Sequence, residues 1–182
     1  KLWQSLPGRL DWISYCLGFC FPSSFNSLVG NSIMTNKQSY FDLQINGYAG
    51  VDFNQSDLSI TDLHFACKKL LEDGVKGILT TVITADLSEM KKRFQNIVGY
   101  RNKDPLVKEV SYGCQFEGPF ISKVKCYKGA HPEEFICEAN VDDMKLLFDS
   151  ADGLTKIVTL APEVDSGNKV TRFLADKGIV VS

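Results

Sequence analysis

The sequence lacks the features that identify a nucleic-acid-binding or membrane protein. Its 182 residues carry a formal net charge of only -2, with 44% hydrophobic and 23% charged residues. A chain so close to neutrality, with scattered lysines and arginines, offers no basic surface for nucleic acid or for an anionic membrane. Its longest apolar stretch, residues 12–22, is shorter than the roughly 20 residues that span a bilayer. We therefore expect neither kind of partner.

The cysteines also lack a metal-binding arrangement. No CxxC pair and no paired histidine occur among Cys16, Cys20, Cys67, Cys114, Cys126 and Cys137, which argues against a zinc-finger site. Cys67 falls in a helical pattern and Cys114 in a strand pattern, where a free cysteine packs as a small hydrophobic residue. We interpret the cysteines as reduced thiols of a cytoplasmic protein.

Two phosphate-binding motifs are missing as well. No GxGxxG follows the first predicted strand and no GxxxxGK[ST] occurs anywhere, which removes the sequence signals for dinucleotide-binding and P-loop sheets. Strand patterns do recur, at residues 41–45, 77–84, 107–116, 156–160 and 179–182. They alternate with helical patterns, which indicates parallel βαβ units. An open doubly wound sheet and the first part of an eight-stranded barrel both remain open.

Capping residues predict where the helices begin. The predicted starts are Ser59 or Thr61, Asp86 or Ser88, Pro132 and Asn140, and a further helix runs through Val170 and Leu174. Gly74 and Gly178 are expected to end the first and last of these helices. Residues 48–58 are predicted to form a loop.

Residues 1–36 do not follow this alternation. They are rich in Trp, Phe, Ser and Cys and show no clean period of 2 or 3.6 residues. We therefore separate an unassigned extension, residues 1–36, from the main segment, residues 37–182. One hypothesis makes Met34 the natural start of the protein, and the other makes the extension an arm that packs on the main domain. N-terminal mass analysis of natively expressed protein distinguishes them.

A carboxylate ends the third predicted strand. An apolar run at residues 110–116 leads to Glu117, Gly118 and Pro119 break the strand, and a basic loop then leads to His131. Because sites in α/β folds gather at the carboxyl ends of strands, Glu117 is a candidate metal ligand or general base. The alternative is a glutamate that only caps a helix or pairs with a nearby lysine.

Several short motifs occur together in a recognisable order. They lie at residues 41–47, 50–53, 80–84, 117–120, 128–131, 159–163 and 178–182. In this combination the chain resembles the N-acetylglucosamine-6-phosphate deacetylase family of the amidohydrolase superfamily, from about residue 41 to the end. The resemblance implies an α/β fold in which residues 37–182 form about the first five strands of a (β/α)8 TIM barrel, its N-terminal part.

The resemblance also implies a reaction and a set of site residues. A metal-dependent hydrolase of this family removes the acetyl group of N-acetylglucosamine-6-phosphate, giving glucosamine-6-phosphate and acetate. Glu117 would bind one divalent metal ion (Zn, Fe, Mn or Co), and Ala130 and His131 would contact the sugar phosphate. Gln44 and Asn46 would line the site, or would form no more than a satisfied amide pair at a strand end. Lys128 or His131 could donate to the phosphate.

The family's other two metal ligands are histidines on later strands, and its catalytic aspartate ends the eighth strand. This chain has only two histidines, His64 and His131, and His64 falls within a helical pattern. We therefore expect no catalytic residue in this chain and no activity from it alone. The alternatives are a non-catalytic sugar-phosphate-binding module and a deacetylase of another N-acetyl amino sugar phosphate. The resemblance further implies a homodimer at full length, and a partial barrel should expose apolar surface that favours assembly.

Overall fold

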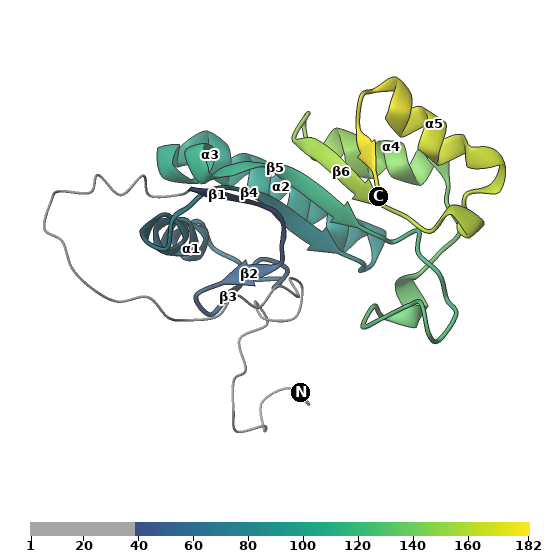
Figure 1. Ribbon diagram of the computed structural model, residues 1–182, viewed down its shortest axis with the longest axis horizontal. Helices are drawn as coiled ribbons and strands as arrows, with labels where there is room; N and C mark the ends of the chain where they lie inside the picture. The colour runs from purple at the N-terminus through teal and green to yellow at the C-terminus, as the bar shows by residue number, and fades with distance from the viewer. Residues whose placement is uncertain (1–38) are drawn as a thin grey trace, which may run out of the picture. The chain divides into compact units, whose positions relative to one another are not determined.

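The chain folds around a five-stranded parallel sheet (Figure 1). The computed structural model describes residues 39–182, so our expectations for residues 1–36 lie outside the described residues. The sheet contains β1 (Tyr40–Ile45), β4 (Val75–Ile83), β5 (Ser111–Glu117), β6 (Thr155–Thr159) and β7 (Val180–Val181). Its spatial order is β1-β4-β5-β6-β7, and every neighbouring pair is parallel. The five predicted strands are thus all present.

The strand order decides between the two predicted architectures. A doubly wound sheet reverses its strand order and carries helices on both faces. Here each crossover steps in the same direction along the sheet, and right-handed crossovers then place the connecting helices on one face. Figure 1 shows α2 behind β4 and β5. The described residues therefore form a curled half-barrel sheet, which is part of a (β/α)8 barrel.

Side-chain caps fix the starts of three helices as the sequence predicts. The helices are α1 (Ile60–Glu72), α2 (Leu87–Lys103), α3 (Pro105–Val110), α4 (Val141–Ser150) and α5 (Lys169–Asp176). Ser59 and Asp62 form a reciprocal capping box at the start of α1. Asp86 caps α2 and Asn140 caps α4. Short 3-10 turns complete the chain: η2 (Glu133–Phe135), η3 (Pro162–Val164) and η4 (Ser166–Asn168).

Two of the predicted segments are wrong. The strand predicted from residue 107 begins only at Ser111, because α3 occupies the preceding residues. The Asp104 side chain accepts from the backbone N–H groups of Leu106 and Val107, and Pro105 stands at the first helical position. Both features start a helix. The loop predicted at residues 48–58 also contains part of a hairpin, β2 (Gly47–Tyr48) and β3 (Val51–Asp52).

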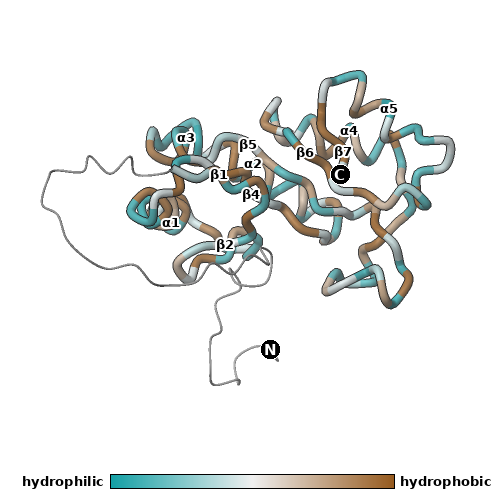
Figure 2. Tube along the Cα trace, in the orientation of Figure 1, coloured by the Kyte–Doolittle hydropathy of each residue, from teal (hydrophilic) through white to brown (hydrophobic). Residues whose placement is uncertain are grey.

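The apolar core lies between the sheet and its helices, in two clusters. The larger packs α2, α4 and α5 on β4, β5 and β6, with the rings of Phe94 and Phe116 centred 4.0 Å apart. The smaller packs α1 and α3 against Ile45 and Ile78. Figure 2 shows hydrophobic and hydrophilic segments alternating along the helices, as expected when only one helix face is buried. No helix among residues 39–182 is both long and apolar enough to cross a membrane.

Cysteine burial and exposed strand residues agree with two further expectations. Cys67 and Cys114 are buried and free, and burial raises the pKa of each thiol to about 12.

Large hydrophobic side chains are also exposed on the strands, at Tyr40, Phe41, Leu43, Tyr112 and Val180. The exposed apolar surface is therefore present, and assembly through it stays a prediction.

Candidate functional site

Glu117 stands at the carboxyl end of β5, in the middle of the sheet. Its register neighbours are Ile83 of β4 and Thr159 of β6. The Thr84 hydroxyl donates to the Glu117 carbonyl oxygen at 3.0 Å, and the next backbone N–H, that of Gly118, donates to the Thr159 carbonyl oxygen at 3.2 Å. The backbone that carries this carboxylate is therefore held from both neighbouring strands.

Gly118 is required by the turn that follows Glu117. Its φ is +89°, in a region that favours glycine, and an added Cβ would overlap the Thr84 hydroxyl. A larger residue here would strain the backbone and displace the same hydroxyl that holds the Glu117 carbonyl. The backbone conformation and the close approach of Thr84 therefore explain why glycine occupies position 118.

The loop after Gly118 brings His131 back to the strand end. His131 Nε2 lies 3.8 Å from Glu117 Oε1, and the two side chains are 18% and 20% exposed. Within the loop, the backbone N–H groups of Tyr127 and Lys128 both donate to the Val124 carbonyl oxygen. The structure therefore brings together two of the predicted site residues, and both remain accessible to a ligand.

A charged pair stands in the same loop. Lys128 Nζ lies 3.0 Å from Glu133 Oε2. The hydrogen bond and the positive charge of Lys128 lower the pKa of the Glu133 carboxyl. Ala130 lies between Lys128 and His131 in sequence and is exposed. The loop therefore presents one histidine and one ammonium group close together along the chain.

The other predicted residues are not linked to this pair. Gln44 and Asn46 are exposed at the end of β1, which β4 separates from β5. Among the described residues, their side chains hydrogen-bond neither to Glu117 or His131 nor to each other. Their role as site-lining residues stays a prediction. His64 pairs instead with Asp104, Nδ1 to Oδ2 2.7 Å apart, as expected for a histidine on a helix.

Sequence reasoning missed a row of polar side chains next to Glu117. The Thr81 hydroxyl donates to Gln115 Oε1 at 3.0 Å, and Gln115 Nε2 donates to Thr159 Oγ1 at 3.2 Å. Gln115 lies two residues before Glu117 and therefore shares its face of the sheet. A signal was available, because Gln115 is a polar residue between Cys114 and Phe116 in an otherwise apolar strand.

Asn54 extends this polar region beyond the end of β1. Its Nδ2 donates to the Thr81 carbonyl oxygen at 2.9 Å, and its Oδ1 accepts from the Ile83 backbone N–H at 3.0 Å. The last register pair of β1 with β4 is Ile45 with Thr80. The Asn54 amide therefore satisfies backbone groups of β4 that lie past this point.

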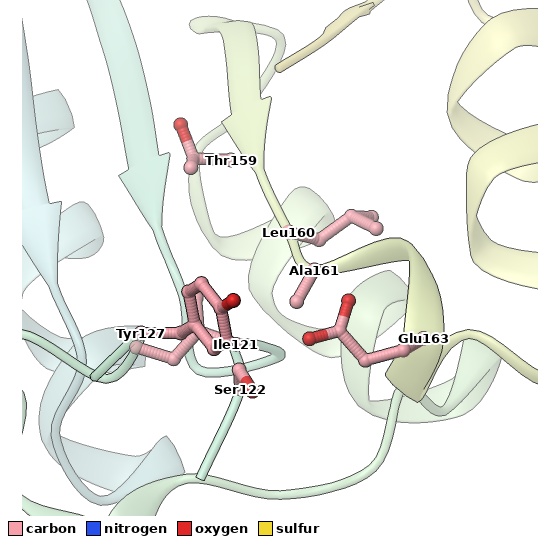
Figure 3. A pocket seen from close by; sticks show the side chains of 7 residues that line it. All are labelled: Ile121, Ser122, Tyr127, Thr159, Leu160, Ala161 and Glu163. Carbon is pink, nitrogen blue, oxygen red and sulfur yellow. The ribbon is translucent and has the colours of Figure 1, made fainter. Parts of the chain in front are cut away.

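A pocket of about 420 Å³ opens at the ends of β5 and β6 (Figure 3). It is lined by Ile121, Ser122, Tyr127, Thr159, Leu160, Ala161 and Glu163. Thr159 belongs both to this lining and to the polar row. The pocket therefore adjoins the strand position beside Glu117.

The described residues do not form a metal site by themselves. No group of three or more His, Cys, Asp or Glu side chains within residues 39–182 is arranged to hold a metal ion. Glu117 and His131 offer one oxygen and one nitrogen donor, whereas a zinc site has three or four protein ligands. This pair can contribute to a metal site but does not complete one.

Comparison with known proteins yields one consistent group of relatives. The chain is 33% identical over 143 residues to N-acetylglucosamine-6-phosphate deacetylase of Bacillus subtilis, covering 78% of this chain and 35% of the relative. It is 34% identical over 146 residues to the Bos taurus protein of the same name, covering 79% and 35%. The corresponding Pasteurella multocida crystal structure is 33% identical, with a TM-score of 0.64 and coverage of 79% and 36%. No family model matches.

This chain is similar to part of an N-acetylglucosamine-6-phosphate deacetylase. The resemblance inferred from the motifs is thereby confirmed. The deacetylase of Mycobacterium smegmatis, 20% identical with a TM-score of 0.68 over 79% of this chain and 35% of its own, supports the fold alone. A mutant of that deacetylase has been solved in complex with N-acetyl-D-glucosamine-6-phosphate. The chain spans about 35% of the length of the curated deacetylases it matches.

Proposed function

We propose that this chain forms part of the active site of an N-acetylglucosamine-6-phosphate deacetylase. The observation that carries the proposal is the approach of His131 to Glu117, at 3.8 Å, at the carboxyl end of a parallel strand. Active sites of (β/α)8 enzymes lie at this end of the strands. The names of the curated relatives support the choice of substrate.

Each residue has a role in this proposal. Glu117 is one ligand of a divalent metal ion, which when bound would lower the pKa of a coordinated water and polarise the acetyl carbonyl. His131 donates to the substrate phosphate, Ala130 borders it, and the Lys128 ammonium group supplies positive charge. Gln44 and Asn46 line the site from β1. Homodimer formation by the full-length protein belongs to the same proposal and is tested by sedimentation velocity.

The chain by itself binds the substrate but does not hydrolyse it, in our proposal. A metal site needs three or four protein ligands, and the whole sequence has only two histidines. An assay for acetate release from N-acetylglucosamine-6-phosphate, with and without added Zn²⁺ or Co²⁺, should give no more than the background rate. Acetate release by the chain alone would contradict this part.

Calorimetric titration with glucosamine-6-phosphate tests the binding role. His131→Ala should weaken binding about tenfold or more, because it removes a hydrogen bond to a charged group worth about 1.5–3 kcal/mol. The matched control is His64→Ala, which removes the other histidine, located on α1 and paired with Asp104. Equal affinities of the two variants would remove His131 from the site.

Metal dependence separates the deacetylase site from a sugar-phosphate-binding module without turnover. The module is favoured by the lack of a three-donor group among residues 39–182. If Glu117 is a metal ligand, the full-length deacetylase should bind Zn²⁺ and Glu117→Gln should abolish that binding. Binding of glucosamine-6-phosphate without any Zn²⁺ binding would favour the module.

A further inference from the structure

The Thr159 hydroxyl is a hydrogen-bond donor with no acceptor among the described residues. The Ile45 backbone N–H donates to Thr81 Oγ1 at 2.9 Å, and the Thr81 hydroxyl donates to Gln115 Oε1 at 3.0 Å, which is closer than its other acceptor, the Leu79 carbonyl oxygen at 3.4 Å. This orients the Gln115 amide, whose Nε2 then donates to Thr159 Oγ1. The Thr159 proton cannot point back to that donor. It is therefore available to a ligand.

Glu163 provides the complementary group in the same pocket. It begins the turn η3 together with Pro162, and Figure 3 shows its carboxylate pointing toward the loop that carries Ile121, Ser122 and Tyr127. Among the described residues, the Glu163 side chain makes no hydrogen bond and no ion pair. Both carboxylate oxygens can therefore accept hydrogen bonds from a ligand.

The remaining lining suits a ring with both polar and apolar surface. Ile121, Leu160 and Ala161 give an apolar wall, and Tyr127 contributes a phenol. The volume of about 420 Å³ falls within the roughly 300–1,000 Å³ of small-molecule pockets. A phosphate is disfavoured in this pocket, because the Glu163 carboxylate would repel it and no Lys, Arg or His side chain of the described residues lines the pocket to offset that repulsion. A neutral or cationic polyhydroxylated group is not repelled by this carboxylate.

We propose that this pocket binds the ring of an amino sugar, with Thr159 donating to it and Glu163 accepting from its hydroxyl or ammonium groups. The inference rests on the proposed function and deepens it. Thr159 is the register neighbour of Glu117, so a ring in this pocket lies next to the proposed metal ligand. Lys128 follows the lining residue Tyr127 in the chain, so we assign the phosphate of the same ligand to the basic loop that carries Lys128 and His131.

Three probes distinguish the ring subsite from the phosphate subsite: glucosamine-6-phosphate, glucosamine and inorganic phosphate, each titrated into the chain and followed by NMR. Glu163→Gln and Thr159→Val should each weaken glucosamine-6-phosphate and glucosamine binding about fivefold to tenfold. Neither should change the binding of inorganic phosphate. Thr159→Ser, which keeps the hydroxyl, should restore the affinity that Thr159→Val loses. Glu109→Gln on α3 is the matched control for the carboxylate, and thermal melting checks the fold of every variant.

The outcomes separate the two proposals. Unchanged affinity for glucosamine-6-phosphate in both Glu163→Gln and Thr159→Val overturns the ring subsite, while a loss in His131→Ala keeps the proposed function. An equal loss for inorganic phosphate overturns the subsite as well. Glucosamine-6-phosphate binding that depends on Glu163 but not on His131 keeps the subsite and removes the proposed function. A wild-type chain that binds neither sugar overturns both.

Discussion

The two faces of the sheet are made by the same strands but have different chemistry. On the helix-covered face, Val82 and Phe116 are fully buried among apolar side chains. On the other face, their neighbours Thr81 and Gln115 are equally buried but joined by hydrogen bonds, and the row leads to Glu117. Because side chains alternate along a strand, the group that stabilises the fold and the group that forms the candidate site lie one residue apart. Substitutions can therefore separate the two faces.

Phe116→Ala should have the largest effect on stability. It removes a fully buried ring that packs on Phe94, and such truncations cost about 3–5 kcal/mol. Urea denaturation measures the loss. The control is Phe65→Ala, since Phe65 is 44% exposed and should cost under about 1 kcal/mol. Similar losses in the two variants would contradict the assignment of the helix-covered face as the main source of stability.

Gly118→Ala should come next, with a loss of about 2–4 kcal/mol from backbone strain and displacement of the Thr84 hydroxyl. The matched variant is Gly153→Ala, at a glycine that also has a positive φ, +78°, but no atom within 4 Å of an added Cβ. It should lose only about 1 kcal/mol. The difference between the two melting curves isolates the contact with Thr84. No difference would show that this contact is unimportant.

Thr81→Val tests the polar face. Valine keeps the shape but removes the hydroxyl that accepts from the Ile45 N–H and donates to Gln115. Leaving these buried groups unpaired should cost about 1–3 kcal/mol. Thr81→Ser keeps the hydroxyl and should retain more of the stability, as measured by urea denaturation. A valine variant as stable as wild type would mean that the polar row matters only for ligands.

Asp165→Asn should have the smallest effect, and one that depends on pH. The pKa of Asp165 is lowered in the folded protein. Burial alone would raise it, but hydrogen bonds from the N–H groups of Thr171 and Val170 and from the Thr171 hydroxyl outweigh that effect. Because the pKa is lowered in the folded state, the ionised carboxylate stabilises the fold at pH values above the unfolded-state pKa of about 3.9. That stabilisation is lost as the pH falls through the folded-state pKa. The variant should therefore lose about 1–2 kcal/mol at pH 7. Denaturation curves at pH 7 and pH 3 should show the difference shrinking in acid, and a constant difference would contradict it.

Local signals in the sequence predicted most of the fold. Ser59, Asp86 and Asn140 are caps whose hydrogen bonds reach only two or three residues ahead, so the helix starts were predictable. The start of β5 was not, because the apolar residues of α3 run directly into the strand. The polar row was missed for another reason. Thr81 and Gln115 are 34 residues apart, and only the register of β4 with β5 makes them neighbours.

The candidate site was predicted in its central pair and not in its surroundings. Glu117 and His131 were identified by motif order, and the structure places them together. Gln44 and Asn46 come from the same kind of motif, but no hydrogen bond links them to that pair among the described residues. Glu163 was noted only as the end of a strand motif. Its proposed role depends on a pocket formed by the end of β6, the turn η3 and the loop after β5, and none of these segments alone reveals that pocket.

The Asn54 side chain pairs with backbone groups of β4 that would otherwise need a longer β1 as their partner. Its amide holds two backbone groups of β4, at Thr81 and Ile83, and Ile83 is the register neighbour of Glu117. The segment after the β2–β3 hairpin is thereby fastened to the strand position next to the central carboxylate. A displacement of that segment would therefore reach the site through two hydrogen bonds and one strand pairing, without passing through the apolar core.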